Sequence, residues 1–166
     1  MKVGGRFDAV MAFPAMRVGV RTQGETIGEI RYLPSAAALV APGNPLAERA
    51  VRQIERYMED PDFRFELPLA EAGTPFQRRV WEAIRAIARG HTLTYGEMAR
   101  ALRSVPRAVG QACGANPFPL VVPCHRVVGA KSVGGFAHHG AGFHIEIKQW
   151  LLQHEHAPSR RERERP

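Results

Sequence analysis

Cysteine and lysine are scarce in this sequence, and long apolar runs are missing. Only two of the 166 residues are cysteines, Cys113 and Cys124, too few for a disulfide framework and, without well-placed histidines, for a structural zinc site. The apolar stretch over residues 36–41 is far shorter than the ~20 residues that span a bilayer. We therefore expect no bound metal and no membrane anchor. Reduced thiols indicate the cytoplasm, or the nucleus if the source is eukaryotic.

Positive charge exceeds negative charge, and most of it comes from arginine. The formal net charge is +7, and lysine occurs only at Lys2, Lys131 and Lys148. Guanidinium groups contact phosphates in a bidentate geometry, so this balance favours a nucleic-acid partner, although a protein with a charged tail has the same balance. Residues 157–166, APSRRERERP, contribute part of the excess and predict a disordered charged tail because they have no apolar periodicity.

Residues 1–70 predict a small sheet followed by a helix. Stretches of alternating apolar residues, interrupted by Pro14 and by the Gln23-Gly24 turn, predict three short antiparallel strands. Asn44 is a good N-cap residue, and the apolar face that follows it predicts a helix that packs on the sheet. The next segment is rich in proline and predicts a connection, so we place a domain boundary near residue 70.

Residues 71–156 predict a mostly helical domain. Thr74 and the proline after it start one helix, for which Gly90 is the expected stop. Two short helices, over about 95–102 and 106–115, are separated by a tight break. Such a pair resembles a helix-turn-helix, although plain helical hairpins are also common.

The sequence Pro-Cys-His-Arg-Val at residues 123–127 places a thiol beside a potential base. His125 and the charge of Arg126 could lower the pKa of the Cys124 thiol from its usual ~8.5. Residues 117–123 are too rich in proline for a helix and predict an extended segment that delivers the cysteine. Because neighbours on a strand point to opposite faces, the thiol and imidazole can cooperate only if a turn follows the proline. The alternative is an unreactive, buried cysteine.

Two further charged residues have a functional and an ordinary interpretation. Glu155, at the end of the last predicted helix, could orient His125 as the third member of a relay, or it could be a solvated carboxylate. Arg107 lies in the first turn of the second short helix. It could contact a partner there, but most helical arginines are solvated.

Several motifs occur in the order typical of one known family: GTPFQRRVW, TYGEMA, RAVGQA, NPFPLVVPCHRVV, VGGF and KQWLLQHE. On these motifs, the chain from about Gly73 to Glu155 resembles the C-terminal active domain of the O6-alkylguanine-DNA alkyltransferases. The first seventy residues match that family only in plan. The resemblance implies an α+β fold, with a small N-terminal antiparallel sheet and helix on a ribonuclease H-like plan, followed by a mostly helical, winged helix-turn-helix-like domain.

The resemblance implies a monomeric protein that repairs alkylated guanine, and possibly alkylthymine, in double-stranded DNA. The damaged base would rotate into a pocket where Cys124 accepts the alkyl group irreversibly, once per molecule and without a cofactor. His125 would act as base through a bridging water, and Glu155 would set its tautomer. Tyr95 would donate to the guanine ring, and Asn116 would brace the turn before the cysteine.

The resemblance also assigns residues to the DNA surface and to the pocket. Arg107 would fill the space that the rotated base leaves in the stack. The other DNA-contacting positions would be Ala108, Gly110, Gln111, Gln77 and Arg126. The pocket positions would be Phe136, Ala137, Val127 and Cys113. Phe136-Ala137-His138 replaces a frequent tyrosine-serine-glycine sequence, which bears on substrate range, and Cys113 could be a second, slower alkylation site.

The alternative functions differ in what Cys124 does. A non-catalytic protein that binds alkylated DNA, like the alkyltransferase-like proteins, commonly has tryptophan at this position. A thiol hydrolase would turn over repeatedly and would leave the helix-turn-helix unexplained. A transcription regulator would need a sensor module, which is not evident. The cysteine therefore favours alkyl transfer, with damage binding as the alternative.

Overall fold

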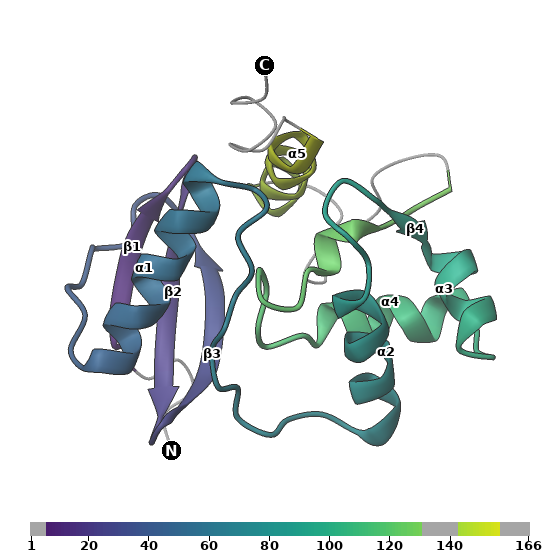
Figure 1. Cartoon of the computed structure of the whole chain (residues 1–166), viewed down its shortest axis with the longest axis horizontal. Helices are drawn as coiled ribbons and strands as arrows, with labels where there is room; N and C mark the ends of the chain where they lie inside the picture. The colour runs from purple at the N-terminus through teal and green to yellow at the C-terminus, as the bar shows by residue number, and fades with distance from the viewer. Residues whose placement is uncertain (1–5, 131–142, 157–166) are drawn as a thin grey trace.

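The computed structural model describes residues 6–130 and 143–156, apart from the side chain of residue 143. Figure 1 shows a sheet with one helix at one side of the molecule, a group of helices at the other side, and the last helix between them. The predicted tail, residues 157–166, lies outside the described residues, as do the pocket candidates Phe136 and Ala137.

The N-terminal strands form an antiparallel sheet in chain order. They are β1 (Ala9–Phe13), β2 (Met16–Gln23) and β3 (Thr26–Leu33). The pairing of Ala9 with Val20 sets the register of β1 on β2, and both side chains are buried. The three predicted strands are therefore confirmed, with alternate side chains entering the core.

Helix α1 (Pro45–Glu59) covers the sheet, as Figure 1 shows. Asn44 caps it, because its side chain accepts a hydrogen bond from the backbone N–H of Ala47 at 2.8 Å, and proline occupies the first helical position. Ala47, Ala50 and Ile54 are fully buried against the strands. The predicted start of this helix is thus confirmed.

The connection after α1 is hydrogen-bonded to the outer edge of β3. Ile27 donates its N–H to the carbonyl of Pro68 at 2.7 Å, and Ala70 donates to the carbonyl of Ile27 at 2.9 Å. A third bond, from the N–H of Ile30 to Pro117 at 2.9 Å, attaches the sheet to the segment before Cys124. Buried residues from both halves of the chain form one cluster. The domain boundary near residue 70 stays a prediction.

Helix α2 (Pro75–Arg85) begins with a capping box between Thr74 and Gln77, and its predicted start is confirmed. Its predicted end is wrong. The helix ends at Arg85, not at Gly90, because the N–H of Ala86 bonds to carbonyls of the last turn and the chain leaves the helix there. The sequence gives no glycine or proline at that point to indicate the end.

The start of α2 is fixed by a contact with Gly73. This residue has a φ of +84°, and a Cβ there would lie 2.5 Å from the ring of Trp81. The Trp81 indole N–H donates to the carbonyl of Ala112 at 2.8 Å in a buried position. Glycine therefore lets α2 seat its tryptophan against the helix that contains Ala112.

Two short helices, α3 (Tyr95–Ala101) and α4 (Pro106–Gly114), pack against each other. In the turn between them Arg103 has a φ of 55°, and the Ser104 N–H bonds to the carbonyl of Ala99 at 2.8 Å. The two predicted short helices are confirmed within about one residue at each end. None of the described helices has both the length and the apolar character needed to cross a membrane.

The segment that leads to Cys124 is not extended as predicted. Leu120 has a φ of 76°, and the N–H of Val122 bonds to the carbonyl of Phe118 at 2.8 Å, so the chain folds into turns. A short 3₁₀ helix, η1 (Cys124–Arg126), follows directly. The prolines exclude a regular helix, but they leave enough donors for local turn bonds.

Two short elements and one long helix complete the fold. Strands β4 (Leu93–Thr94) and β5 (Val127–Val128) pair in parallel and place the start of α3 beside the end of η1. The sequence did not predict them, because two residues show no periodicity. Helix α5 (Phe143–His156) then lies across the space between the sheet and the helical part, as seen in Figure 1.

Candidate active site

Cys124 is the first residue of η1 and is 4% exposed. It lines a cavity of about 430 Å³ together with Cys113, Asn116, Pro119 and Tyr32. The tight turn that the Cys-His pair requires is therefore present after the proline, and the thiol opens onto a space large enough for a small substituent.

Asn116 holds the turns that precede the cysteine. Its side-chain amide donates to the carbonyl of Val122 at 2.9 Å and to Cys124 Sγ at 3.2 Å, while its oxygen accepts from the N–H of Phe118 at 2.9 Å. One side chain thus fixes the backbone on both sides of the loop and donates to the sulfur. Donation to the sulfur favours its thiolate form.

The Cys124 thiol lies near the thiol of Cys113. Interaction with Cys113, together with burial, raises the pKa of Cys124 well above its usual value, while the amide of Asn116 and the charge of Lys148 act in the opposite direction. The prediction that His125 and Arg126 lower this pKa is wrong. Without a bound substrate, the thiol is stored in its protonated form.

Lys148 is the cation that faces the two thiols, and sequence reasoning missed it. The side chain lies fully buried on α5, and its ammonium group donates to the carbonyl of Val127 at 2.8 Å. Burial lowers its pKa to about 8, although the nearby cysteines oppose that shift. A signal was available, because Lys148, Leu151 and Glu155 fall on one helical face and the middle residue is apolar.

Tyr95 begins α3 and lies close to Lys148. Its hydroxyl is 3.5 Å from the ammonium nitrogen, which is also 5.6 Å from the ring centroid. Burial raises the pKa of Tyr95 well above its usual value, and the neighbouring cysteines add to the effect. The phenol therefore keeps its proton and can act as a donor toward the site.

His125 and Glu155 form a buried pair, 1% exposed each, with 2.7 Å between His125 Nε2 and Glu155 Oε2. Burial lowers the pKa of His125 and outweighs the effect of the carboxylate, so the imidazole is neutral at neutral pH. Because Nε2 donates to the carboxylate, Nδ1 is the acceptor nitrogen. Nδ1 is buried and has no hydrogen-bond partner among the described residues.

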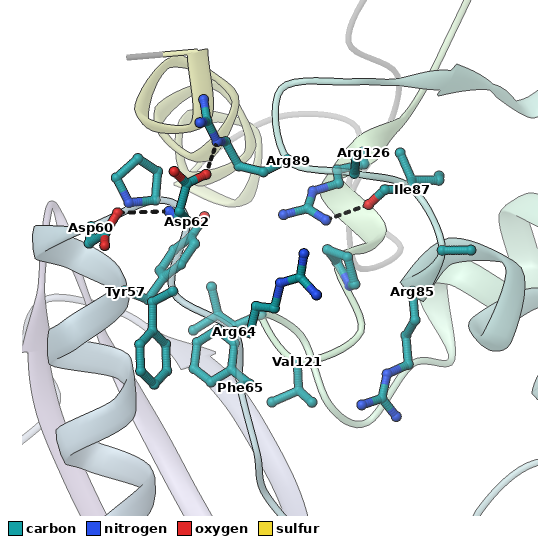
Figure 2. A pocket seen from close by; sticks show the side chains of 16 residues that line it. Tyr57, Asp60, Asp62, Arg64, Phe65, Arg85, Ile87, Arg89, Val121 and Arg126 are labelled. Atoms are coloured by element: carbon teal, nitrogen blue, oxygen red, sulfur yellow. Dashed lines mark hydrogen bonds and ion pairs between the residues drawn. The ribbon is translucent and has the colours of Figure 1, made fainter. Parts of the chain in front are cut away.

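Arg126 is part of this cluster. Its guanidinium donates to Glu155 Oε1 at 2.9 Å, to Oε2 at 3.0 Å and to the carbonyl of Ile87 at 2.6 Å, and its side chain is 13% exposed. Figure 2 shows Arg126 at the wall of a cavity of about 910 Å³. The guanidinium that was predicted to contact DNA is thus committed to the carboxylate.

The Glu155 carboxylate accepts hydrogen bonds from several side chains. Burial alone raises the pKa of its carboxyl group, but the hydrogen bonds from His125 and Arg126 and the charge of Arg126 outweigh burial and hold the pKa well below its usual range. Tyr57 of α1 also donates to Oε2, at 2.7 Å. Sequence reasoning missed Tyr57, because it was counted with the apolar face of α1.

The remaining candidates lie where α4 and its neighbours meet solvent. Arg107 and Gln111 are exposed on α4, and Ala108 and Gly110 are half-buried between them. Gln77 uses its side-chain oxygen in the capping box of α2, at 2.9 Å from the N–H of Thr74. Val127 is fully buried and offers its carbonyl to the lysine described above. Among the described residues, no three His, Cys, Asp or Glu side chains are placed to hold a metal ion.

Comparison with known proteins identifies the family. Residues 75–157 match the family model described as 6-O-methylguanine DNA methyltransferase, DNA binding domain. The methylated-DNA--protein-cysteine methyltransferase of Salmonella typhimurium is 48% identical over 54% of this chain and 51% of its own. The constitutive one of Bacillus subtilis is 41% identical over 67% of each chain.

A solved structure covers nearly the whole fold. OGT of Mycobacterium tuberculosis, in complex with DNA, superposes with a TM-score of 0.71 and 32% identity over 89% of this chain and 91% of that one. In sequence, the chain spans about half to three fifths of the relatives from Salmonella (51%) and a mimivirus (61%). The chain belongs to the 6-O-methylguanine DNA methyltransferase family.

Proposed function

We propose that this protein repairs alkylated DNA by transferring the alkyl group from O6 of guanine to Cys124. The observation that carries the proposal is the environment of the sulfur: Asn116 donates to it at 3.2 Å, and it opens onto a cavity of about 430 Å³. The neighbouring residue is a neutral histidine whose orientation a carboxylate fixes. A nucleophile, a base and an orienting acid are the parts that thiol alkylation requires.

The thiol proton leaves through the histidine. Because Glu155 holds the proton on Nε2 of His125, Nδ1 can accept the Cys124 proton through one bridging water. The imidazolium that forms is stabilised by the carboxylate, and Lys148 and Asn116 stabilise the thiolate. The stored thiol is therefore converted to the nucleophile only when a substrate is in place.

The transfer step is an in-line displacement at carbon. The thiolate of Cys124 forms a new bond to the alkyl carbon, and the bond between that carbon and O6 of guanine breaks. The electron pair of the broken bond moves into the guanine ring. Tyr95, whose phenol stays protonated, would donate a hydrogen bond to that ring. The product is a thioether, and no described side chain is suited to remove the alkyl group, so each molecule acts once and needs no cofactor.

Duplex DNA binds along α4, with the helix in the minor groove. Arg107 is exposed at the start of α4, where it can enter the base stack when the damaged guanine rotates out. Ala108 and Gly110 are small, which allows the helix backbone to approach closely. The net charge of +7 supports phosphate contacts. The protein would bind as a monomer and could also repair O4-alkylthymine.

The test is mass spectrometry after incubation with a duplex that carries one O6-methylguanine. We expect a gain of one CH₂ on the peptide that contains Cys124, saturating at one per molecule. A Cys124→Ser variant should gain nothing and serves as the matched control. Binding to the lesion without a mass gain would support the alternative, a damage-binding protein. If the protein neither binds the lesion nor accepts the alkyl group, both functions are contradicted.

A further inference from the structure

Cys113 and Cys124 are neighbouring thiols. Cys113 lies near the end of α4, and both side chains line the same cavity of about 430 Å³. Each thiol affects the pKa of the other, raising that of Cys124 and lowering that of Cys113. Asn116 holds the two segments together, since its N–H bonds to the carbonyl of Cys113 at 3.2 Å and its amide reaches Cys124 Sγ at the same distance.

The two thiols differ in access and in proton affinity. Cys124 is buried, whereas Cys113 is half-buried. Interaction with Cys124 lowers the pKa of Cys113 despite burial, and Lys148 adds a smaller effect in the same direction. A cysteine that is partly exposed and whose pKa is lowered is the type that reacts with peroxide.

We propose that Cys113 is a peroxide-sensing residue that forms a reversible disulfide with Cys124. In the first step, the Cys113 thiolate attacks one oxygen of hydrogen peroxide. A sulfenic acid forms on Cys113, the O–O bond breaks, and hydroxide leaves and takes the proton that Cys113 had released. In the second step, Cys124 attacks the sulfenic sulfur, loses its proton, and water leaves. Two thiols lose two electrons, and one peroxide becomes two waters.

The pair protects the nucleophile from irreversible oxidation. A lone thiol that is oxidised beyond the sulfenic state becomes a sulfinic or sulfonic acid, which ordinary thiols do not reduce. Conversion to a disulfide stops that sequence, and a dithiol reductant restores both cysteines. The consequence for repair rests on the proposed function, because a disulfide at Cys124 would halt alkyl transfer until it is reduced. The disulfide itself can be tested without any repair assay.

The first experiment measures the mass of one peptide. Residues 108–126 contain both cysteines and no internal arginine or lysine, so one tryptic peptide reports the pair. After brief treatment of the folded, DNA-free protein with hydrogen peroxide, we expect this peptide to lose two hydrogens and to resist iodoacetamide. Dithiothreitol should restore the original mass. Intact mass should show a monomer, which excludes a bond between two molecules.

Two variants separate the steps. The Cys124→Ser variant has no second thiol with which the sulfenic acid of Cys113 can form a disulfide. A 1,3-dione reagent should therefore trap this sulfenic acid. In Cys113→Ser, Cys124 should gain oxygen atoms that dithiothreitol does not remove. Wild-type protein that gains oxygen instead of losing hydrogen, or a Cys113→Ser variant that recovers as fully as wild type, would overturn the proposal.

A separate experiment measures alkyl transfer before and after treatment with peroxide. Each protein is compared with its own untreated sample, so a change in the basal rate of Cys113→Ser does not affect the result. Wild type should lose alkyl transfer after peroxide and regain most of it with dithiothreitol, whereas Cys113→Ser should stay inactive. If no alkyl transfer occurs in untreated wild type, the proposed function fails, while the mass experiment still decides the disulfide.

Discussion

The hydroxyl group of Tyr57 donates to Glu155 Oε2 at 2.7 Å, in a buried bond between residues 98 positions apart. The same oxygen lies 2.7 Å from His125 Nε2. Helix α1 of the N-terminal half therefore touches the carboxylate that orients the proposed base. The sheet-and-helix part contributes to the site as well as to the stability of the fold.

Replacing Tyr57 with phenylalanine should affect both stability and proton transfer. Loss of a hydrogen bond to a charged group lowers the free energy of unfolding by about 1.5–3 kcal/mol. The carboxylate charge then acts more strongly on His125, so the pKa of His125 rises. Transfer needs the neutral imidazole, and the rising limb of the pH–rate profile should move to higher pH. An unchanged limb beside lower stability would assign Tyr57 to packing alone.

Replacing Glu155 with glutamine should destabilise the fold by about 3–5 kcal/mol, because the Arg126 guanidinium stays buried without its counter-charge. Glu146→Gln, at an exposed position on the same helix, is the control and should change stability by less than about 0.5 kcal/mol. Urea titration measures both.

The effect of Glu155 should depend on pH in a defined direction. Its folded-state pKa is depressed, so its stabilising contribution is complete above the unfolded pKa of ~4.3 and is lost as the pH falls through the lower folded value. The stability difference between wild type and Glu155→Gln should be constant near neutrality and shrink in strong acid. A difference that already shrinks near pH 6 would contradict the depressed pKa.

Replacing Arg107 with alanine should slow repair of duplex DNA by roughly tenfold or more, because the rotated base would lose the side chain that takes its place. Reaction with free O6-benzylguanine should change little. Arg52→Ala, on the exposed side of α1, removes the same charge and is the matched control. Equal slowing with both substrates would remove the base-rotation role from Arg107.

Replacing Gly73 with alanine tests how α2 is seated. The new Cβ would lie 2.5 Å from the Trp81 ring, and the φ of +84° would be strained as well. Gly24→Ala, with a φ of +62° and no atom within 4 Å, shares only the strain and should cost about 1–2 kcal/mol. Thermal unfolding should show a larger loss for Gly73→Ala. Equal losses of stability in the two variants would mean that the Trp81 ring can move away from the new Cβ without cost.

The features predicted correctly from the sequence depend on neighbours along the chain. The caps at Asn44 and Thr74 and the apolar faces of their helices are local patterns, and so is the turn between α3 and α4. The end of α2 and the turns before Cys124 were predicted wrongly. At these places hydrogen bonds such as that from Val122 to Phe118 decide the backbone, and residue types alone do not specify them.

The least predictable residues of the site are those whose partners come from far along the chain. The position of Lys148 on one helical face with Leu151 suggests burial, but only the fold shows that its ammonium group donates to the carbonyl of Val127. Arg126 lies two residues after the cysteine, which suggested an electrostatic role toward it. The fold instead turns its guanidinium to Glu155, and the charge acts on the relay and not on the sulfur.

Hydrogen bonds to neighbouring segments cover both edges of the three-stranded sheet. The outer edge of β3 bonds to Pro68 and Pro117, and β1 bonds through Val10 to Val40 on the opposite edge. A three-stranded sheet with open edges invites strand exchange between molecules. Residues 117–123, which lead to Cys124, cover part of one edge through Pro117. A large displacement of this segment would expose the backbone groups of that edge and promote aggregation. The geometry of the site and the resistance of the protein to self-association therefore depend on the same few contacts.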